Sequence, residues 1–475
     1  MYSIDETCIG CGTCEKVCPV NAVDMVETEN GGGSEPRIDM GACTYCRACM
    51  KNCPVDAIKI EESVHSDTWS REKISQISEK ATGGEVRVRG TSARRELPDF
   101  DDLTIRNAQV SRPPIDHYRE PCETEISLGE RNAEEPLALD IPIYIGAMSF
   151  GALSKSAKLA LARGAKEAGS AVDTGEGGML PEEREISDNL VVQYASGRFG
   201  VSADYLRSAD AVELKIGQGA KAGQGGMLME DKVSEEISDV RGTPEKADLI
   251  SPARHMDIVG PEDLKMKIRQ LREIVAWKVP IVVKFAAGRV EEDVKIAAKA
   301  GADAVLVDGT QGGTGAAPNP TLENAGIPTL AATSSAHQAL VEVGLREEVD
   351  LVVSGGINSG SDIAKALALG ADAVSISTAA LVALGCQVCG LCNTGKCPYG
   401  ITTQIPELEE RLDVSEKAGA VKNLLKVFTE EAAMLAMLAG KTSLFNLERQ
   451  DLRALTTEAS EMAGIPLAGT YNRQA

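Results

Sequence analysis

The stretch "PIVVKFAAGRVEEDVKIAAKAGADAVLVDGT" (residues 280–310) contains two apolar runs on either side of an alanine-rich segment. The runs 280–288 and 302–310 are rich in valine and alanine, which is typical of strands that are buried on both faces of a parallel sheet. The segment 291–301 spaces its apolar residues as an amphipathic helix does. The stretch therefore predicts a strand–helix–strand unit.

The same alternation of apolar runs and helical segments extends over residues 137–410. Helices are predicted over 154–169 and 361–371. Repeated strand–helix units over about 250 residues have the size of a (β/α)8 TIM barrel, which is the α/β fold that we predict. A doubly wound sheet is the alternative, and it is disfavoured because no G-x-G-x-x-G opens a helix after the first strand. The remaining six strands are predicted at 141–149, 170–178, 190–198, 211–219, 350–358 and 371–379.

Glycine and polar residues follow most of the predicted strands, as in "DGTQGGTG" and "SGGINSG". In a barrel these strand ends form the catalytic mouth, and the loops after the last two strands often bind a phosphate. Turn geometry alone explains some of the glycines. Backbone N–H groups at a helix start favour a phosphate dianion, so these loops are predicted to bind one. The residues concerned are Ser354, Gly355, Gly356, Ile357, Ser377 and Thr378.

Two cysteine motifs of identical spacing lie near the N-terminus. They read "CIGCGTCEKVCPV" (8–20) and "CTYCRACMKNCPV" (43–55), each a C-x2-C-x2-C-x3-C-P pattern. In such tandem motifs the first three cysteines bind one cluster and the fourth binds the other. Zinc ions or disulfides are the alternatives. We predict two 4Fe-4S clusters, one held by Cys8, Cys11, Cys14 and Cys53, and the other by Cys18, Cys43, Cys46 and Cys49.

Composition and the pattern of apolar residues divide the chain into four segments. Residues 1–60 are predicted to form a small α+β two-cluster ferredoxin-like domain, in which 25–40 is a polar loop. Residues 61–136 carry no repeating apolar pattern and are interpreted as a connector and an arm that lies on the barrel. The barrel of residues 137–410 precedes a C-terminal helical segment, 411–475. The amphipathic pattern within that segment predicts a helix that packs on the barrel or forms a subunit interface.

The charge and cysteine content restrict location and partners. A net charge of −22 over 475 residues argues against nucleic acid or an anionic membrane as a partner. The longest apolar run, 373–386, is too short to span a bilayer. The 13 cysteines, in a chain without a visible signal peptide, indicate thiolate ligands in a reducing compartment. We therefore expect a cytoplasmic protein.

Iron–sulfur clusters carry single electrons, whereas most metabolic reductions require two. A flavin mononucleotide (FMN) would supply both the phosphate for the predicted loops and the conversion between one and two electrons. This chemical argument predicts FMN as a cofactor.

Several motifs in the barrel region occur in the order that is typical of one family. From about residue 140 to 410 the chain resembles the FMN-binding synthase domain of glutamate synthase. The ferredoxin-like segment ahead of it resembles the short archaeal type of that enzyme. The motifs are "MSFGALS" (148–154), "DTGEGG" (173–178), "YASGRFGVS" (194–202), "GQGAKAGQGG" (217–226), "LISPARHMDI" (249–258), "DGTQGGTGA" (308–316) and the cysteine stretch "LGCQVCGLCNTGKCPYGITTQ" (384–404).

The resemblance implies a third cluster, a 3Fe-4S cluster held by C-x5-C-x4-C. In this sequence the ligands would be Cys386, Cys392 and Cys397, within 386–397. The chain departs from the family pattern at Cys389, which adds a further thiol inside the motif. If Cys389 also ligates, the cluster would be a 4Fe-4S cluster, and both alternatives remain open.

The resemblance also implies the reaction, which is FMN-dependent reductive amination of 2-oxoglutarate by ammonia to L-glutamate. It places the substrate on Lys221 and Arg241, with Glu176 nearby. Met227 stands where the family carries glutamine. Lys284 lies within an apolar run, where an unpaired buried lysine would be costly, so an anionic ligand is expected as its partner. Besides Gly355, Gly356, Ser377 and Thr378, the FMN contacts implied are Met148, Ser149, Gln193, Lys215 and Lys284.

The remaining expectations concern partners and alternatives. The chain starts Met1-Tyr2 instead of with a nucleophilic cysteine and has no nicotinamide fingerprint. Ammonia is therefore expected free or from a separate glutaminase-type subunit, and electrons from ferredoxin or an NADPH-oxidising partner. One alternative is a related FMN and iron–sulfur enzyme acting on another glutamate-like substrate, as a methylglutamate synthase does. The other is a non-catalytic electron-transfer subunit, which would have no use for Lys221 and Arg241 as carboxylate anchors.

Overall fold

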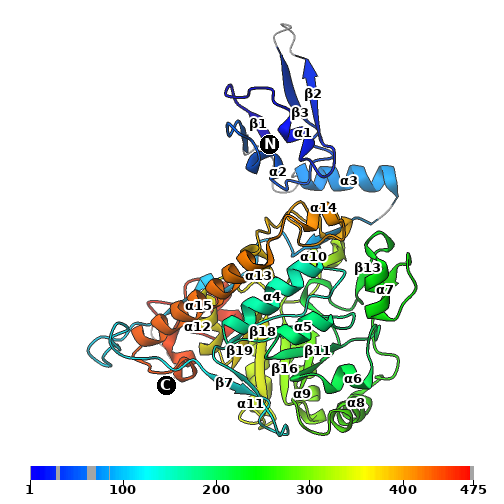
Figure 1. Ribbon diagram of the computed structural model, residues 1–475. Helices are drawn as coiled ribbons and strands as arrows, with labels where there is room; N and C mark the ends of the chain where they lie inside the picture. Colours follow the sequence, from blue (N-terminus) through cyan, green and yellow to red (C-terminus); the bar gives the residue numbers. More distant parts are fainter. Residues whose placement is uncertain (1, 28–32, 61–70, 85, 471–475) are drawn as a thin grey trace.

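The computed structural model, shown in Figure 1, describes residues 2–27, 33–60, 71–84 and 86–470. Its larger part is a closed barrel of parallel strands in the order β10-β11-β12-β15-β16-β18-β19-β9. Every strand lies within one of the eight apolar runs, so the predicted TIM barrel is confirmed and the doubly wound sheet is excluded. The strands are β9 (Ile143–Ile145), β10 (Val172–Asp173), β11 (Leu190–Tyr194), β12 (Ala211–Lys215), β15 (Ile281–Ala286), β16 (Ala304–Asp308), β18 (Asp350–Ser354) and β19 (Ala373–Ile376).

Helices surround the strands, as the strand–helix alternation requires. The predicted helices are present as α4 (Lys155–Glu167), α9 (Val290–Ala300) and α12 (Gly360–Ala368). The Ser154 and Ser359 hydroxyls cap the first turns of α4 and α12 by accepting backbone N–H bonds. The other helices are α5 (Pro181–Ile186), α6 (Ala203–Arg207), α7 (Glu235–Arg241), α8 (Pro261–Ile274), α10 (Asn319–Asn324), α11 (Thr329–Glu342), α13 (Thr378–Ala383) and α14 (Pro406–Glu409).

The interior of the barrel is closed at the amino ends of its strands. An antiparallel hairpin, β7 (Ile126–Leu128) and β8 (Leu137–Leu139), packs Leu128, Leu137 and Leu139 against side chains of the strands. Gly129 lies so close to Pro280, the residue before β15, that a Cβ at 129 would be 2.2 Å from the Cβ of Pro280. The carboxyl ends of the strands are thus the open end, where a barrel places its active site.

The N-terminal domain contains two short antiparallel strand pairs. β1 (Tyr2–Ile4) pairs with β4 (Ile58–Ile60), and β2 (Val23–Glu27) pairs with β3 (Ser34–Ile38). The expectation that 25–40 is a polar loop was therefore wrong at its two ends, which are strands; its middle, 28–32, lies outside the described residues. Two single-turn helices lie within the cysteine motifs, α1 (Thr13–Lys16) and α2 (Ala48–Lys51).

Residues 71–136 contain more helices and strands than their sequence predicts. Helix α3 (Arg71–Gly83) follows 61–70, which lies outside the described residues. Strand β5 (Val88–Thr91) pairs with β17 (Thr314–Pro318), which follows the loop after β16. Strand β6 (Leu103–Ile105) pairs with β20 (Leu452–Ala454) near the C-terminus. The arm thus touches the barrel both at its mouth and at its side.

The C-terminal segment packs on the outside of the barrel. Helix α15 (Val414–Leu438) lies along α4 and α12, as Figure 1 shows. Close approach requires glycine, because a Cβ at Gly164 of α4 would lie 2.7 Å from the Cβ of Val421. α15 therefore packs on the barrel through its apolar face. Helix α16 (Thr457–Ala463) contacts α11, and β13 (Met227–Leu228) pairs with β14 (Leu249–Ile250) beside the mouth.

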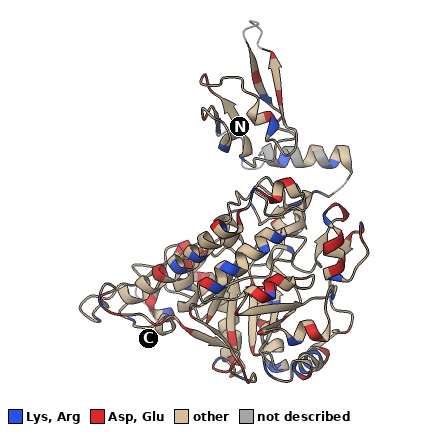
Figure 2. Ribbon diagram, in the orientation of Figure 1, with Lys and Arg blue, Asp and Glu red and all other residues tan. Residues whose placement is uncertain are grey.

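Figure 2 shows acidic and basic residues interleaved along the helices around the barrel. Among the described residues, no helix combines the length and the apolar character that crossing a membrane requires.

Candidate active site and cysteine cavities

A cavity of about 420 Å³ opens at the carboxyl ends of the barrel strands, within the range of small-ligand and cofactor sites. It lies between the βα loops, the arm and the C-terminal cysteine stretch. All fourteen residues predicted to bind cofactor or substrate line it, including Ser354 and Ile357 of the phosphate loop, and so does Met227. The other twelve are Met148, Ser149, Glu176, Gln193, Lys215, Lys221, Arg241, Lys284, Gly355, Gly356, Ser377 and Thr378.

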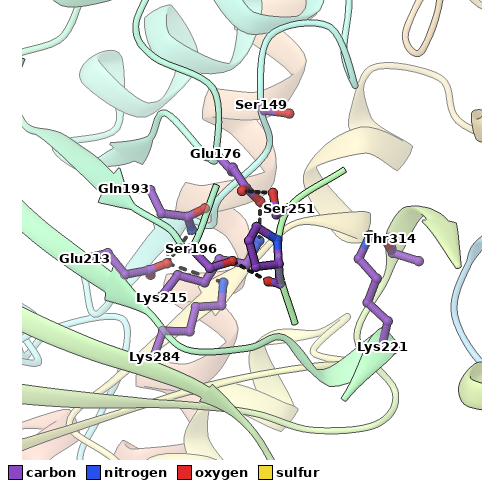
Figure 3. A network of polar contacts seen from close by, with 12 residues as sticks. Ser149, Glu176, Gln193, Ser196, Glu213, Lys215, Lys221, Ser251, Lys284 and Thr314 are labelled. Atoms are coloured by element: carbon purple, nitrogen blue, oxygen red, sulfur yellow. Dashed lines mark hydrogen bonds and ion pairs between the residues drawn. The ribbon is translucent and has the colours of Figure 1, made fainter. Parts of the chain in front are cut away.

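Glu176 is the central carboxylate of this cavity (Figure 3). Its Oε2 lies 3.2 Å from the Nζ of Lys215 at the end of β12, and its Oε1 accepts a hydrogen bond from the Ser251 hydroxyl. Burial acts to raise the pKa of Glu176, but Lys215, the Ser251 hydrogen bond and Arg241 outweigh it and hold the pKa below its usual value. Glu176 is therefore ionised at neutral pH.

Lys221 is a buried cation without a carboxylate partner among the described residues. It is 3% exposed, and its Nζ donates to the carbonyl oxygen of Ala316 at 2.9 Å. Burial, together with the charge of Lys215, lowers its pKa to about 7. A lysine in this state changes its protonation readily when an anion enters the cavity.

Arg241, at the end of α7, lies on the other side of Glu176. Its Nη2 donates to the Ser149 hydroxyl at 3.1 Å and to the Phe150 carbonyl at 2.7 Å, while its buried Nε has no hydrogen-bond partner in the described part of the chain. Burial lowers its pKa to about 10, so it remains charged. The absence of a side chain at Gly177 makes room for the guanidinium, because a Cβ there would lie 2.6 Å from Cζ.

The floor of the cavity is a polar network between strands, visible at the left of Figure 3. Lys284 Nζ lies 3.7 Å from Glu213 Oε1, and Gln193 Nε2 donates to the same oxygen at 2.6 Å. Burial opposes the charge of Lys284, but Glu213, Asp308 and Asp173 outweigh it and raise the pKa of Lys284. The buried Lys284 thus has an anionic partner within the protein, Glu213, where an anionic ligand was expected, and it keeps its charge.

The two loops predicted to bind phosphate border the cavity as well. Gly355 and Gly356 have φ values of +108° and +80°, and a Cβ would lie 2.8 Å from the Gly309 oxygen and 2.7 Å from the Gln311 Cβ, respectively. Only glycine fits this turn. Helix α13 begins at Thr378, so its first N–H groups border the same space.

Sequence reasoning did not select several residues that line the cavity. Ser251 and Asp308 lie inside the quoted motifs and could have been found there. Asp308 is buried, and its Oδ2 accepts from the Gly219 N–H at 2.9 Å. Thr91 and Ser92 come from the arm, and no pattern in the sequence signals that they reach the mouth.

His255 orients this region without facing the reaction space. Its Nε2 lies 2.8 Å from the Lys215 carbonyl oxygen, and its ring stacks on Tyr194 with centroids 5.8 Å apart. Burial lowers its pKa. The residue therefore supports the end of β12, from which Lys215 projects.

The eight N-terminal cysteines line two separate cavities. Cys8, Cys11, Cys14 and Cys53 border one, and Cys18, Cys43, Cys46 and Cys49 border the other, which are the two predicted ligand sets. No three His, Cys, Asp or Glu side chains of the described residues are grouped to hold a single metal ion. A polynuclear cluster spaces its thiolates more widely than one zinc ion does, so the cavities fit clusters better.

The C-terminal cysteines face two directions. Cys386 and Cys392 line the main cavity, and Cys397 is buried in the barrel core. Cys389 instead packs in an apolar cluster with Cys46 and Ala48 of the N-terminal domain and with Leu391. Burial raises the pKa of Cys389 to about 12, and the nearby thiols of Cys392, Cys397 and Cys46 act in the same direction.

The comparisons with known proteins agree with this architecture. Residues 94–442 match the conserved region in glutamate synthase, which is more than half of the chain. The chain belongs to the glutamate synthase family. Residues 7–57 match the 4Fe-4S dicluster domain, so the predicted family and its iron–sulfur module are confirmed.

Curated glutamate synthase relatives cover most of the chain. The glutamate synthase large subunit-like protein of Rhizobium meliloti is 48% identical over 421 residues, 85% of this chain and 95% of that protein. The archaeal glutamate synthase (NADPH) of Methanocaldococcus jannaschii is 42% identical over 432 residues, 84% of this chain and 85% of that protein. A solved flavocytochrome b2 variant with benzoylformate, at 16% identity and TM-score 0.51, covers 81% of this chain and 83% of that one and shows the barrel fold.

The polar groups that line the main cavity are chemically suited to a phosphorylated flavin. It offers the cations Lys215 and Lys284 and two glycine- and serine-containing loops at one end. The buried Ser375 hydroxyl and the Asp308 Oδ1 atom have no hydrogen-bond partner within the described part of the chain. Buried polar atoms of this kind are usually satisfied by a ligand or water.

Proposed function

We propose that this chain is the catalytic subunit of a glutamate synthase that reductively aminates 2-oxoglutarate to L-glutamate. The observation that carries the proposal is the convergence of Lys221, Arg241 and Glu176 in the cavity that Cys386 and Cys392 also line. A carboxylate-binding site and a thiolate loop beside the same cavity are what electron-driven chemistry on a dicarboxylate requires.

FMN would be held by the residues that line the inner part of the cavity. The loops of Gly355, Gly356, Ser377 and Thr378 would bind its phosphate through backbone N–H groups. When bound, the flavin converts single electrons into a hydride for the substrate. Met148, Ser149, Gln193, Lys215 and Lys284 would contact the rest of the cofactor.

The substrate carboxylates would bind to Lys221 and Arg241. Arg241 keeps its charge and presents an unpartnered Nε, which suits it to a carboxylate. Lys221, with a pKa lowered to about 7 by burial, is poised to donate a proton at Nζ to the carbonyl oxygen that leaves as water. Glu176 is ionised and would stabilise the positive charge that develops on the iminium nitrogen.

Electrons would enter through the N-terminal domain. The cavity of Cys8, Cys11, Cys14 and Cys53 includes the exposed residues Ile9 and Cys11, so this 4Fe-4S cluster would face the donor. The cluster on Cys18, Cys43, Cys46 and Cys49 would face the barrel, because Cys46 packs beside Cys389. Lys51 lies 4.8 Å from the centre of the Tyr399 ring and joins the same interface.

The third cluster is proposed to be a 3Fe-4S cluster on Cys386, Cys392 and Cys397. Cys397 belongs to the barrel core and Cys386 packs against it, whereas Cys389 belongs to the interface cluster with Cys46. Because its side chain faces the N-terminal domain, we propose that Cys389 is a packing residue and not a ligand. It would then lie on the path between the second cluster and the third.

The nitrogen source and the electron donor would be separate proteins or free solutes. We propose free ammonia or a glutaminase-type subunit as the source of nitrogen, and ferredoxin or an NADPH-oxidising subunit as the source of electrons. The protein is proposed to function in the cytoplasm, where cysteines remain reduced.

An anaerobic stopped-flow experiment tests the proposed function. Protein with flavin and iron in place is reduced with dithionite and mixed with 2-oxoglutarate and ammonium chloride. We expect the flavin absorbance to return only when both are present. Reduced protein that ignores 2-oxoglutarate but passes electrons to an artificial acceptor would favour the electron-transfer alternative, whereas a response to methylamine but not to ammonia would favour the methylglutamate synthase-like one.

A further inference from the structure

Lys232 is a buried lysine that the proposed reaction leaves unused. It ends a short helical turn, Glu230–Lys232, that links β13 to α7, and it is 4% exposed. Its Nζ donates to two carbonyl oxygens, those of Ala152 at 2.9 Å and Cys392 at 3.2 Å. The side chain therefore reaches from the barrel mouth into the C-terminal cysteine loop.

Lys232 forms no ion pair with a carboxylate among the described residues. Other buried lysines of the barrel do: Lys158 lies 2.7 Å from Glu183, and Lys284 lies 3.7 Å from Glu213. Carbonyl oxygens solvate an ammonium group only partly, and a buried charge without a counter-charge is costly. The buried charge of Lys232 is therefore not neutralised by any carboxylate among the described residues.

Lys232 lies against the loop between two predicted cluster ligands, Cys392 and Cys397, because its Nζ donates to the Cys392 carbonyl oxygen at 3.2 Å. The loop between them is shaped around the lysine, because Gly395 adopts φ +70° and a Cβ there would lie 3.2 Å from Lys232 Cγ. The aliphatic part of the side chain thus packs on the loop turn, while its Nζ is directed to the backbone of one predicted cluster ligand.

We propose that Lys232 is the counter-cation of the C-terminal iron–sulfur cluster and raises its reduction potential. The inference rests on the proposed function only in assuming that Cys386, Cys392 and Cys397 hold a cluster. Reduction adds one electron, supplied by the neighbouring 4Fe-4S cluster, and so adds one negative charge. A fixed positive charge close by stabilises the reduced form more than the oxidised form.

A raised potential would give the third cluster a directional role. Electrons arriving from the N-terminal domain would collect on the cluster beside the substrate cavity. Lys232 is thus a positioning and tuning residue, not a catalytic one, since it does not line the cavity.

Redox titration of the full-length, anaerobically purified protein, followed by electron paramagnetic resonance, tests this role. The informative variants are Lys232→Met, which removes charge and donor, Lys232→Gln, which keeps a donor, and Lys232→Arg, which keeps the charge. Lys396→Met is the matched control, because Lys396 is exposed and directly precedes Cys397. Iron and sulfide analysis accompanies every titration.

We expect Lys232→Met and Lys232→Gln to shift the midpoint of the C-terminal cluster to lower potential or to lose that cluster alone. Lys232→Arg and Lys396→Met should retain the wild-type midpoint, and the N-terminal clusters should be unchanged throughout. An unshifted midpoint in Lys232→Gln with full iron content, or an equal shift in Lys232→Arg, would overturn the proposal. A wild-type protein that lacks the C-terminal cluster would instead refute the proposed function.

Discussion

The Nζ atom of Lys215 lies 3.2 Å from Oε2 of Glu176, and this ion pair joins the end of β12 to the loop after β10. Both groups border the cavity at the mouth of the barrel. Because burial is outweighed by Lys215, Ser251 and Arg241, the pKa of Glu176 is held below its usual value. The site therefore holds the ionised Glu176 between the cations Lys215 and Arg241.

Replacing this anion should stop the reaction without dismantling the site. We expect Glu176→Gln to lower the rate of 2-oxoglutarate-dependent flavin reoxidation by about 10²–10³-fold, the usual contribution of one preorganised group that stabilises developing charge. Flavin and iron contents should stay at wild-type level. Glu182→Gln is the control, because Glu182 pairs with Lys155 on the surface. A Glu176→Gln protein with the wild-type rate would remove Glu176 from the mechanism.

Binding of a dicarboxylate should be coupled to protonation of Lys221. Burial lowers the pKa of this lysine to about 7, and a bound carboxylate would raise it again. Binding should thus take up a proton near neutral pH, and affinity should fall as the pH rises above about 7. Calorimetry of 2-oxoglutarate binding in buffers of different ionisation enthalpy measures this uptake. In Lys221→Arg the uptake should vanish; uptake that persists there would assign the proton to another group.

The barrel and the residues around its mouth could be predicted from the sequence. All eight barrel strands were predictable because parallel strands buried on both faces are continuous apolar runs, as in Ile281–Ala286. The phosphate-binding loops were predictable because the carboxyl ends of parallel strands converge on one face. The substrate residues Lys221, Arg241 and Glu176 and the other FMN contacts were predicted from the resemblance to the glutamate synthase family. The roles assigned to them remain predictions.

Contacts between distant segments account for what was missed. Strands β5 and β6 have four and three residues, too few for a recognisable sequence pattern, so only their partners β17 and β20 reveal them. The packing of Cys389 on Cys46 joins residues from different domains. Lys232 approaches Cys392 across the mouth of the barrel. No local pattern encodes such tertiary relationships.

A buried ion pair beneath the mouth should dominate local stability. Lys158 and Glu183 are both 1% exposed in their side chains and lie 2.7 Å apart. Lys158 Nζ also donates to the carbonyl oxygens of Met148 at 2.8 Å and Thr174 at 3.1 Å, which fixes two cavity loops. We expect Lys158→Met to lower the free energy of unfolding by about 3–5 kcal/mol in denaturant titrations, because it leaves the buried Glu183 carboxylate without its ion-pair partner.

The control for this change is Lys166→Met on the same helix, since Lys166 pairs with Asp188 at the surface. It should cost at most about 1 kcal/mol, as exposed ion pairs do. Similar losses of unfolding free energy in both variants would mean that the buried ion pair contributes no more to stability than the exposed one.

Cys389 should be dispensable for the iron content. We expect Cys389→Ala to retain the iron and the oxidised-state resonance of the C-terminal cluster, because its side chain packs on Cys46 and Leu391. Cys392→Ala should lose both. The measurement is iron analysis combined with electron paramagnetic resonance of anaerobically purified protein. Loss of one iron from Cys389→Ala would make Cys389 a ligand and the cluster a 4Fe-4S cluster.

The central claim is that electrons stored in this chain reduce an adduct of 2-oxoglutarate and ammonia. The most direct test is a single turnover: fully reduced holoprotein, freed of excess reductant, is mixed anaerobically with 2-oxoglutarate and ¹⁵N-ammonium, and the products are analysed by mass spectrometry. We predict ¹⁵N-labelled L-glutamate in an amount set by the electrons stored. Oxidation of the protein without labelled glutamate, or no oxidation at all, would contradict the account.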